Sequence, residues 1–143
     1  MYDNSLALMA AMREEGIEFR SDTPESDDNV FDVVRVSWRG RSLPMTEVEI
    51  RLTERGAALR AGLGAVDPAR RDEALRECNA VNASYRWMRL AVDGAGELQA
   101  LSDVFLVPEV AGLFGITAVG MLFDSLDELH PRLAPLFLSA GAR

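Results

Sequence analysis

The apolar positions of the chain follow two periods, and the change from one to the other marks the predicted elements. Between Leu6 and Met12 apolar residues recur at helical spacing, which predicts a first helix that ends at Gly16. From Val30 onward the period is two, and Thr46–Thr53 alternates apolar with charged residues. Such alternation is typical of antiparallel strands with one buried and one wet face.

Three strands of this kind form a predicted meander, with glycine-containing turns between them. They lie around Val34–Trp38, Thr46–Thr53 and Leu59–Leu63, and Ile17–Arg20 is a candidate for a further short strand. Arginines and glutamates of neighbouring strands then face one another on the wet side of the sheet. Exposed ion pairs of that kind contribute little to stability.

A second helix and a hairpin follow the meander. Asp67, followed by proline, combines an N-cap with proline at the first helical position. It predicts a helix running to Asn82, which ends it in a left-handed conformation. Residues 87–92 then predict a strand, Asp93–Gly96 a tight turn, and Leu98 the start of the return strand.

Pro108 opens a long last helix with one broad apolar face. That face consists of Val110, Leu113, Phe114, Thr117, Met121, Leu122, Ser125, Leu126 and Leu129. The longest uncharged run, Val110–Phe123, is fourteen residues long, which favours a buried core helix over a membrane span. Pro131 and Pro135 are expected to break the helix into a short tail.

The elements therefore follow one another in the order α-β-β-β-(β)-α-β-β-α. This order predicts an α+β domain with an antiparallel sheet of about five to six strands and helices packed on one face. The 143 residues suit one domain, and no linker divides them. We expect residues 1-143 to fold as a single unit.

Charge and composition exclude several classes of function. The formal net charge of −8 repels phosphate backbones and anionic lipid, so we expect no nucleic-acid partner and no membrane partner. All fifteen basic residues are arginine, which excludes a Schiff-base lysine, a phosphate-loop lysine and a lysine general base. A single cysteine allows no internal disulfide and suits a cytoplasmic protein.

Candidate catalytic groups are few. Cys78 lies on the apolar stripe of its predicted helix, and His130 lies at the end of the last helix, so both are explained by structural roles. The sequence leaves a Cys78–His130 dyad open. The acidic run Ser21–Asn29 lacks the glycine and the terminal glutamate of a calcium-binding loop. We predict no catalytic residue, no cofactor and no metal site.

Five residues are candidates for binding a partner. Trp38 and Trp87 lie on predicted strands, where each is either a core residue or part of a partner surface. Gly112, Gly115 and Gly120 leave flat patches on the last helix that another helix could approach closely. Packing of that helix against its own sheet explains these glycines equally well.

The stretch between residues 75 and 106 resembles the YbjN family of bacterial sensory transduction regulators. The resemblance rests on Cys78–Asn82 at the end of a helix, Arg89 on a strand, the Asp93-Gly94 turn, the return strand into Leu101–Leu106, and the close at Leu126–Leu133. It extends from Gly16 to Leu133. It implies a fold shared with type III secretion chaperones, a strongly bent antiparallel sheet and frequent homodimerisation. No catalytic residues are carried across.

These observations favour a non-enzymatic regulatory or chaperone-like module that engages a peptide segment or a partner protein, and we expect it to be a dimer. Its acidic surface favours a basic or amphipathic partner. Two alternatives remain open. An enzyme that uses carboxylates and arginines alone predicts an enclosed Asp or Glu with a raised pKa. A structural subunit of a larger assembly predicts an exposed apolar patch.

Overall fold

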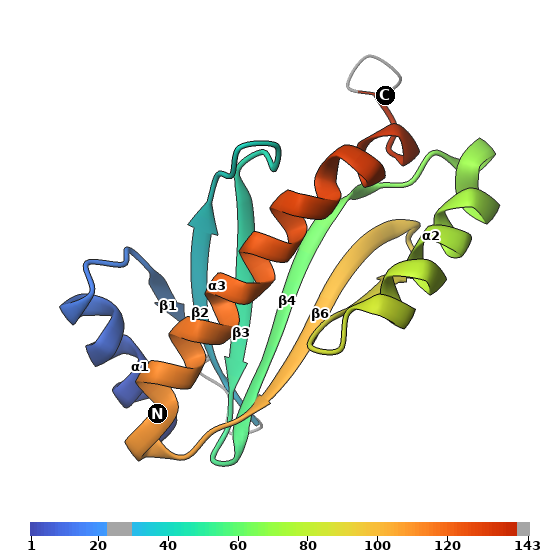
Figure 1. Ribbon diagram of the computed structural model, residues 1–143. Coiled ribbons are helices and arrows are strands. Elements are labelled where there is room, and N and C mark those ends of the chain that lie inside the picture. Colours follow the sequence, from blue (N-terminus) through green and yellow to red (C-terminus); the bar gives the residue numbers. More distant parts are fainter. Residues whose placement is uncertain (23–29, 140–143) are drawn as a thin grey trace.

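The computed structural model describes residues 1–22 and 30–139 and shows an α+β fold (Figure 1). The helices are α1 (Asp3–Glu14), η1 (Pro68–Arg70), α2 (Arg71–Ser84), α3 (Pro108–Leu133) and η2 (Ala134–Leu136). The strands are β1 (Arg20–Asp22), β2 (Asp32–Trp38), β3 (Thr46–Leu52), β4 (Gly56–Ala65), β5 (Arg89–Val92) and β6 (Glu97–Phe105). The predicted order is confirmed, with four strands before α2.

All six strands form one antiparallel sheet in the order β1-β2-β3-β4-β6-β5. The first strand is Arg20–Asp22 rather than the expected Ile17–Arg20. Most of the acidic run lies in residues 23–29, outside the described residues. The predicted turn at Asp93–Gly96 is confirmed: Gly96 has φ +82°, and the Asp93 carboxylate accepts from two backbone N–H groups of the turn.

The core lies between one face of the sheet and α3, which crosses that face diagonally (Figure 1). Alternate strand residues such as Val48, Ile50 and Leu59 are buried there, as the period of two predicts. Leu122 and Leu126 are buried on the facing side of α3. Length and mean hydropathy alone would let Pro108–Leu136 cross a membrane, a test that core helices of soluble proteins also pass.

α1 packs beside the first half of α3 and is bonded to the sheet at its N-terminus. Its C-terminus ends at Gly16 with φ +71°, as predicted, because only glycine adopts this conformation at little cost. The side-chain amide of Asn4 donates to the carbonyls of Thr53, Glu54 and Leu106 at 2.9–3.3 Å. The N-terminus of α1 is therefore fixed to the β3–β4 turn and to the end of β6.

Two expectations about helix ends were wrong. Asn82 does not end α2, which continues to Ser84; its side-chain amide instead exchanges two hydrogen bonds with the backbone of Leu90, at 2.7 and 3.0 Å. β5 is the last strand of the sheet, so the Asn82 amide supplies at Leu90 the hydrogen bonds that a further strand would make. Pro131 does not break α3, which runs through it to Leu133, and η2 follows.

The end of α3 is held to the β2–β3 turn by one carboxylate. Asp127 accepts hydrogen bonds from the backbone N–H groups of Leu43 and Ser42 at 2.8 Å and of Arg41 at 3.2 Å. These bonds lower the pKa of Asp127, because they favour the ionised carboxylate. The same carboxylate fills the space that a side chain at Gly40 would need.

Candidate partner-binding site

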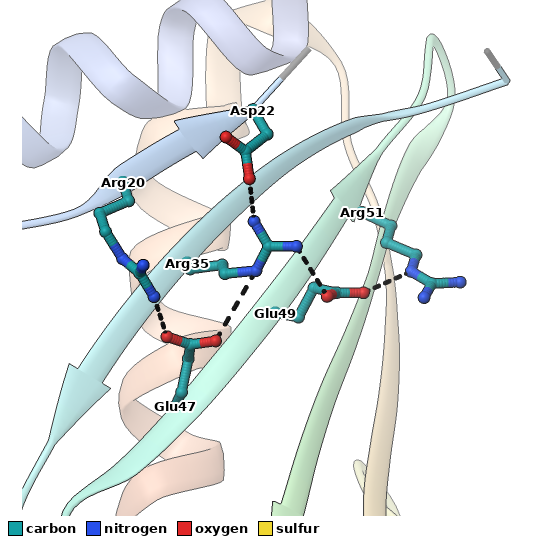
Figure 2. A network of polar contacts seen from close by, with 6 residues as sticks. All are labelled: Arg20, Asp22, Arg35, Glu47, Glu49 and Arg51. Atoms are coloured by element: carbon teal, nitrogen blue, oxygen red, sulfur yellow. Dashed lines mark hydrogen bonds and ion pairs between the residues drawn. The ribbon is translucent and has the colours of Figure 1, made fainter. Parts of the chain in front are cut away.

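The face of the sheet away from α3 carries a network of ion pairs (Figure 2). Arg35 pairs with Glu47 at 3.7 Å, with Glu49 at 3.2 Å and also with Asp22, and Glu49 bonds Arg51 at 2.6 Å. Burial by itself would lower the pKa of Arg35, but its carboxylate partners outweigh burial and raise it. Within the described chain these charged side chains therefore satisfy one another.

Every described carboxylate with a resolved pKa shift has its pKa lowered. Burial by itself would raise the pKa of Glu49, but Arg51 and Arg35 outweigh it and lower the value. The pKa of Asp93 is lowered by backbone N–H bonds, first that of Glu97. An enclosed general acid needs the opposite shift. No described carboxylate with a resolved shift therefore fits the enzyme alternative.

Cys78 and His130 do not form a dyad by hydrogen bonding within the described chain. Cys78 is buried in the core, and burial raises the pKa of its thiol. His130 lies in the last turns of α3. Among residues 1–22 and 30–139, no group of three His, Cys, Asp or Glu side chains is placed to hold a metal ion.

An apolar groove lies between the first half of α3 and the end of β6. The groove has a volume of about 270 Å³. Its lining is Trp87, Ser102, Asp103, Val104, Phe114, Thr117, Ala118 and Met121. Trp87, Phe114 and Met121 are 44%, 46% and 41% exposed. Three large apolar side chains therefore remain open to solvent around one concave site, which we call the α3–β6 groove.

Trp87 forms one wall of the groove and is held by polar contacts. The structure places it in the connection between α2 and β5 rather than on the predicted strand. Its indole Nε1–H donates to the hydroxyl of Ser125 at 3.0 Å, and its carbonyl accepts from the hydroxyl of Ser102 at 2.5 Å. The ring of Tyr85 packs edge-on against the indole. These contacts fix an aromatic wall whose other face is free.

The opposite wall shows that the broad apolar face expected for α3 is not uniformly buried. Leu122 and Leu126 are in the core, whereas Phe114 and Met121 lie on the groove and Leu113 is 68% exposed. In the first half of α3 the buried residues are Ala111, Gly115 and Val119, which lie outside the predicted face. Small residues at these positions let the helix approach its neighbours closely, so the buried stripe is rotated from the larger apolar side chains and leaves those exposed.

The end of β6 is the floor of the groove and has an unpaired edge. β5 pairs with β6 only from Leu98 to Leu101, so within the described chain no strand lies on that side of Asp103–Phe105. Phe105 is 91% exposed. Its ring borders a second hollow of about 400 Å³ on the outer face of the sheet, where Ala58 and Gly56 supply little side-chain bulk.

The five predicted partner-binding residues lie in four different environments. Trp87 lines the groove, whereas Trp38 packs its ring on Phe123 with centroids 5.3 Å apart. Gly112 and Gly115 face α1: a Cβ at these positions would lie 2.5 Å from Ala11 Cβ and 2.7 Å from Leu8 Cδ1. Gly120 has no atom within 4 Å of such a Cβ. Trp87 and Gly120 thus face open space, and Trp38, although it packs on Phe123, is still 36% exposed.

No protein-family model matches the chain, and no curated protein matches it. Among solved structures, a chain in the heterodimeric complex ExoU-SpcU from the type III secretion system of Pseudomonas aeruginosa is similar. The TM-score is 0.53 at 19% sequence identity, and the match covers 90% of this chain and 95% of that chain. At this identity the likeness shows the fold alone, and it confirms the type III secretion chaperone-like fold. Kinship with the YbjN family stays a prediction.

Proposed function

We propose that this protein is a non-enzymatic, chaperone-like module that binds a polypeptide segment of a partner in the α3–β6 groove. The observation that carries the proposal is the exposure of Trp87, Phe114 and Met121 around one concave apolar site. Large aromatic and methionine side chains are enriched in protein interfaces because they bury much apolar area. The chaperone-like fold supports the same role.

The proposal includes the finer expectations drawn from the sequence. The chain is a cytoplasmic member of the YbjN family and forms a homodimer. Leu113 and Gly120 are exposed on α3 and offer a second surface on which another copy can pack, separate from the groove. Light scattering during size-exclusion chromatography should then give twice the 15.7 kDa of one chain.

Site-specific photo-crosslinking in cells tests the binding role. The chain has no lysine, so amine-reactive reagents find no side chain here, whereas a photoreactive residue can be placed at will. At position 121 we expect recurrent adducts with a partner polypeptide. Glu73, exposed on α2 and outside the groove, is the control position and should give no such adduct. Equal labelling from both positions, or none from position 121, would contradict the proposal.

A further inference from the structure

We propose that the hollow on the outer face of the sheet binds a small organic carboxylate with an apolar body. This hollow lies over Gly56 and Ala58, between Phe31 and Arg51 on one side and Phe105 on the other, and we call it the outer-face hollow. The inference goes beyond the proposed function, because the hollow opens on the face of the sheet away from α3. It follows from the shape of the hollow, from one positioned guanidinium group and from the local charge.

The shape of the hollow follows from the register of three strands. Arg51 of β3 lies opposite Ala58 of β4, and Ala58 lies opposite Asp103 of β6. The next outward position of β4 is Gly56, which lies opposite Phe105. Two small residues on the middle strand therefore leave a depression between bulkier neighbours. Its volume of about 400 Å³ falls within the roughly 300–1,000 Å³ that is typical of small-molecule sites.

Aromatic rings on two sides favour an apolar body in the ligand. Phe31 lies just before β2, and Phe105, the last residue of β6, is 91% exposed. Between them the methyl group of Ala58 forms part of the floor. An alkyl chain or aryl group that enters the hollow removes these apolar surfaces from water, which is favourable.

Arg51 supplies a guanidinium group whose orientation is fixed. Its Nε donates to Glu49 at 2.6 Å, and the group lies over the ring of Phe31, 4.9 Å from the ring centroid. Figure 2 shows its two terminal nitrogens pointing away from Glu49. Within the described chain these two nitrogens have no acceptor. A guanidinium held in this way can bind a carboxylate through two parallel N–H groups.

The charge around the outer-face hollow differs from that of the whole chain. Arg55 lines it from the β3–β4 turn, and no described carboxylate pairs with this side chain. A neighbouring hollow on the β5 side adds Arg86 and Arg89. Asp103 is the one described carboxylate that lines either hollow, and it pairs with Arg89 at 3.2 Å. This part of the surface therefore attracts an anion, although the net charge of the chain is −8.

A small monoanion suits these charges better than an acidic polypeptide or a membrane. An acidic segment or an anionic lipid surface carries many charges, and the acidic chain as a whole repels them. A single carboxylate in the hollow interacts mainly with the arginines beside it, because salt screens the more distant charges. The preferred ligand is therefore a soluble carboxylate with one charge and a short alkyl chain or an aryl group.

Isothermal titration calorimetry with octanoate tests this inference. We expect saturable binding at one site, and added salt should weaken it because the arginines are partly exposed. Three comparison compounds should each bind at least about tenfold more weakly. Octanol lacks the charge, octylammonium reverses it, and acetate lacks the apolar body. Binding of any of the three as tight as that of octanoate would overturn the inference.

Two variants with matched controls locate the binding. Arg55→Gln removes a cation and should weaken octanoate binding about three- to fivefold. Arg76→Gln, an exposed change on α2 outside the hollow, should leave it unchanged. Ala58→Leu fills the hollow and should weaken binding at least about tenfold, whereas Ala80→Leu, exposed on α2, should not. Equal effects within either pair would contradict the proposed site.

The α3–β6 groove is also apolar, so a separate measurement distinguishes the two sites. In nuclear magnetic resonance spectra octanoate should shift the amide signals of Gly56 and Ala58 more than those of Ala118 and Met121. Met121→Arg, a change within the groove, should leave octanoate binding unchanged. The larger shifts at Ala118 and Met121, or loss of binding in this variant, would assign octanoate to the groove and reject the inference.

Lipid vesicles distinguish a soluble carboxylate from a membrane surface. Vesicles of anionic phospholipid should not co-sediment with the protein, because the acidic chain is repelled by them. Co-sedimentation that the Arg55→Gln variant loses would assign these arginines to a membrane instead and reject the soluble ligand.

Discussion

The two flanks of α3 differ in what covers them. On one flank α1 packs so closely that Gly112 and Gly115 leave no room for a Cβ, and Asn4 bonds three carbonyls beneath it. On the other flank, Phe114 and Met121 face the groove without a covering element in the described chain. The helix itself is apolar on both sides, so composition does not distinguish them.

The difference shows that an apolar helix surface acquires its role from its neighbours. A flank filled by the chain's own α1 contributes to stability, whereas a flank left open is available to a partner. Substitutions on the covered side should therefore change the free energy of unfolding, and those on the open side should change binding alone. The predictions below test this division, beginning with the largest expected effect.

A pair of phenylalanines gives the sharpest contrast. Phe123, which is 5% exposed and packs on Trp38, should cost about 3–5 kcal/mol of unfolding free energy when replaced by alanine. Phe105, which is 91% exposed, should cost no more than about 0.5 kcal/mol for the same change. Urea unfolding followed by circular dichroism measures both. Similar losses at the two positions would mean that Phe105 is covered in solution.

Two glycines of α3 test the covered flank directly. Gly112→Leu forces α1 away, since a Cβ there lies 2.5 Å from Ala11 Cβ, and overpacking of this kind costs about 1–3 kcal/mol. Gly120→Leu adds the same side chain in open space. It should leave the free energy of unfolding unchanged or raise it slightly, because leucine has a higher helix propensity than glycine. If thermal unfolding showed equal losses, α1 would not pack on α3 as described.

The buried amide under α1 is the next test. Asn4→Leu leaves the carbonyls of Thr53, Glu54 and Leu106 without their donor, and unsatisfied buried groups cost about 1–3 kcal/mol. The same substitution at Asn79, exposed on α2, is the control and should change stability little. Protection of α1 amides from hydrogen exchange should fall in the Asn4 variant first. An unchanged α1 would show that the amide does not anchor it.

Acid should weaken the attachment at the far end of α3. Backbone N–H groups lower the pKa of Asp127 in the folded state, so the folded state favours the ionised form. The resulting stabilisation is complete above the unfolded pKa of about 3.9 and is lost as the pH falls through the lower folded value. Unfolding free energies measured between neutral and acidic pH should show this loss, and Asp127→Asn should reduce it. Asp124→Asn, an exposed change on the same helix, should retain it.

Local signals in the sequence predicted most of the fold. Gly16, Asp67 and the Asp93–Gly96 turn each perform the predicted local role, because caps and turns depend on neighbouring backbone alone. The role of Asn82 depends on Leu90, which folding brings to it. Pro131 stays helical within the packed α3. Such tertiary effects override local preference.

The candidate site was only partly predictable for the same reason. The sequence marks Trp87 as a large aromatic residue, but its place in the wall of the α3–β6 groove depends on a hydrogen bond to Ser125 of α3. Phe114 and Met121 were expected to face inward, because periodicity reports which residues share a helix face but not how much of that face a sheet covers. The unpaired edge of β6 followed only from the actual length of β5.

The single thiol, that of Cys78, offers a chemical probe of local opening in the folded protein. Cys78 lies on α2, 6% exposed, and the chain has no second cysteine to compete with it. A thiol reagent can modify it only when α2 lifts from the sheet, so the modification rate reports how often that happens in the native ensemble. α2 contacts β5, the edge strand that pairs with β6 (Figure 1). The modification rate of Cys78 therefore also reports whether a bound partner reduces the opening of this edge of the sheet.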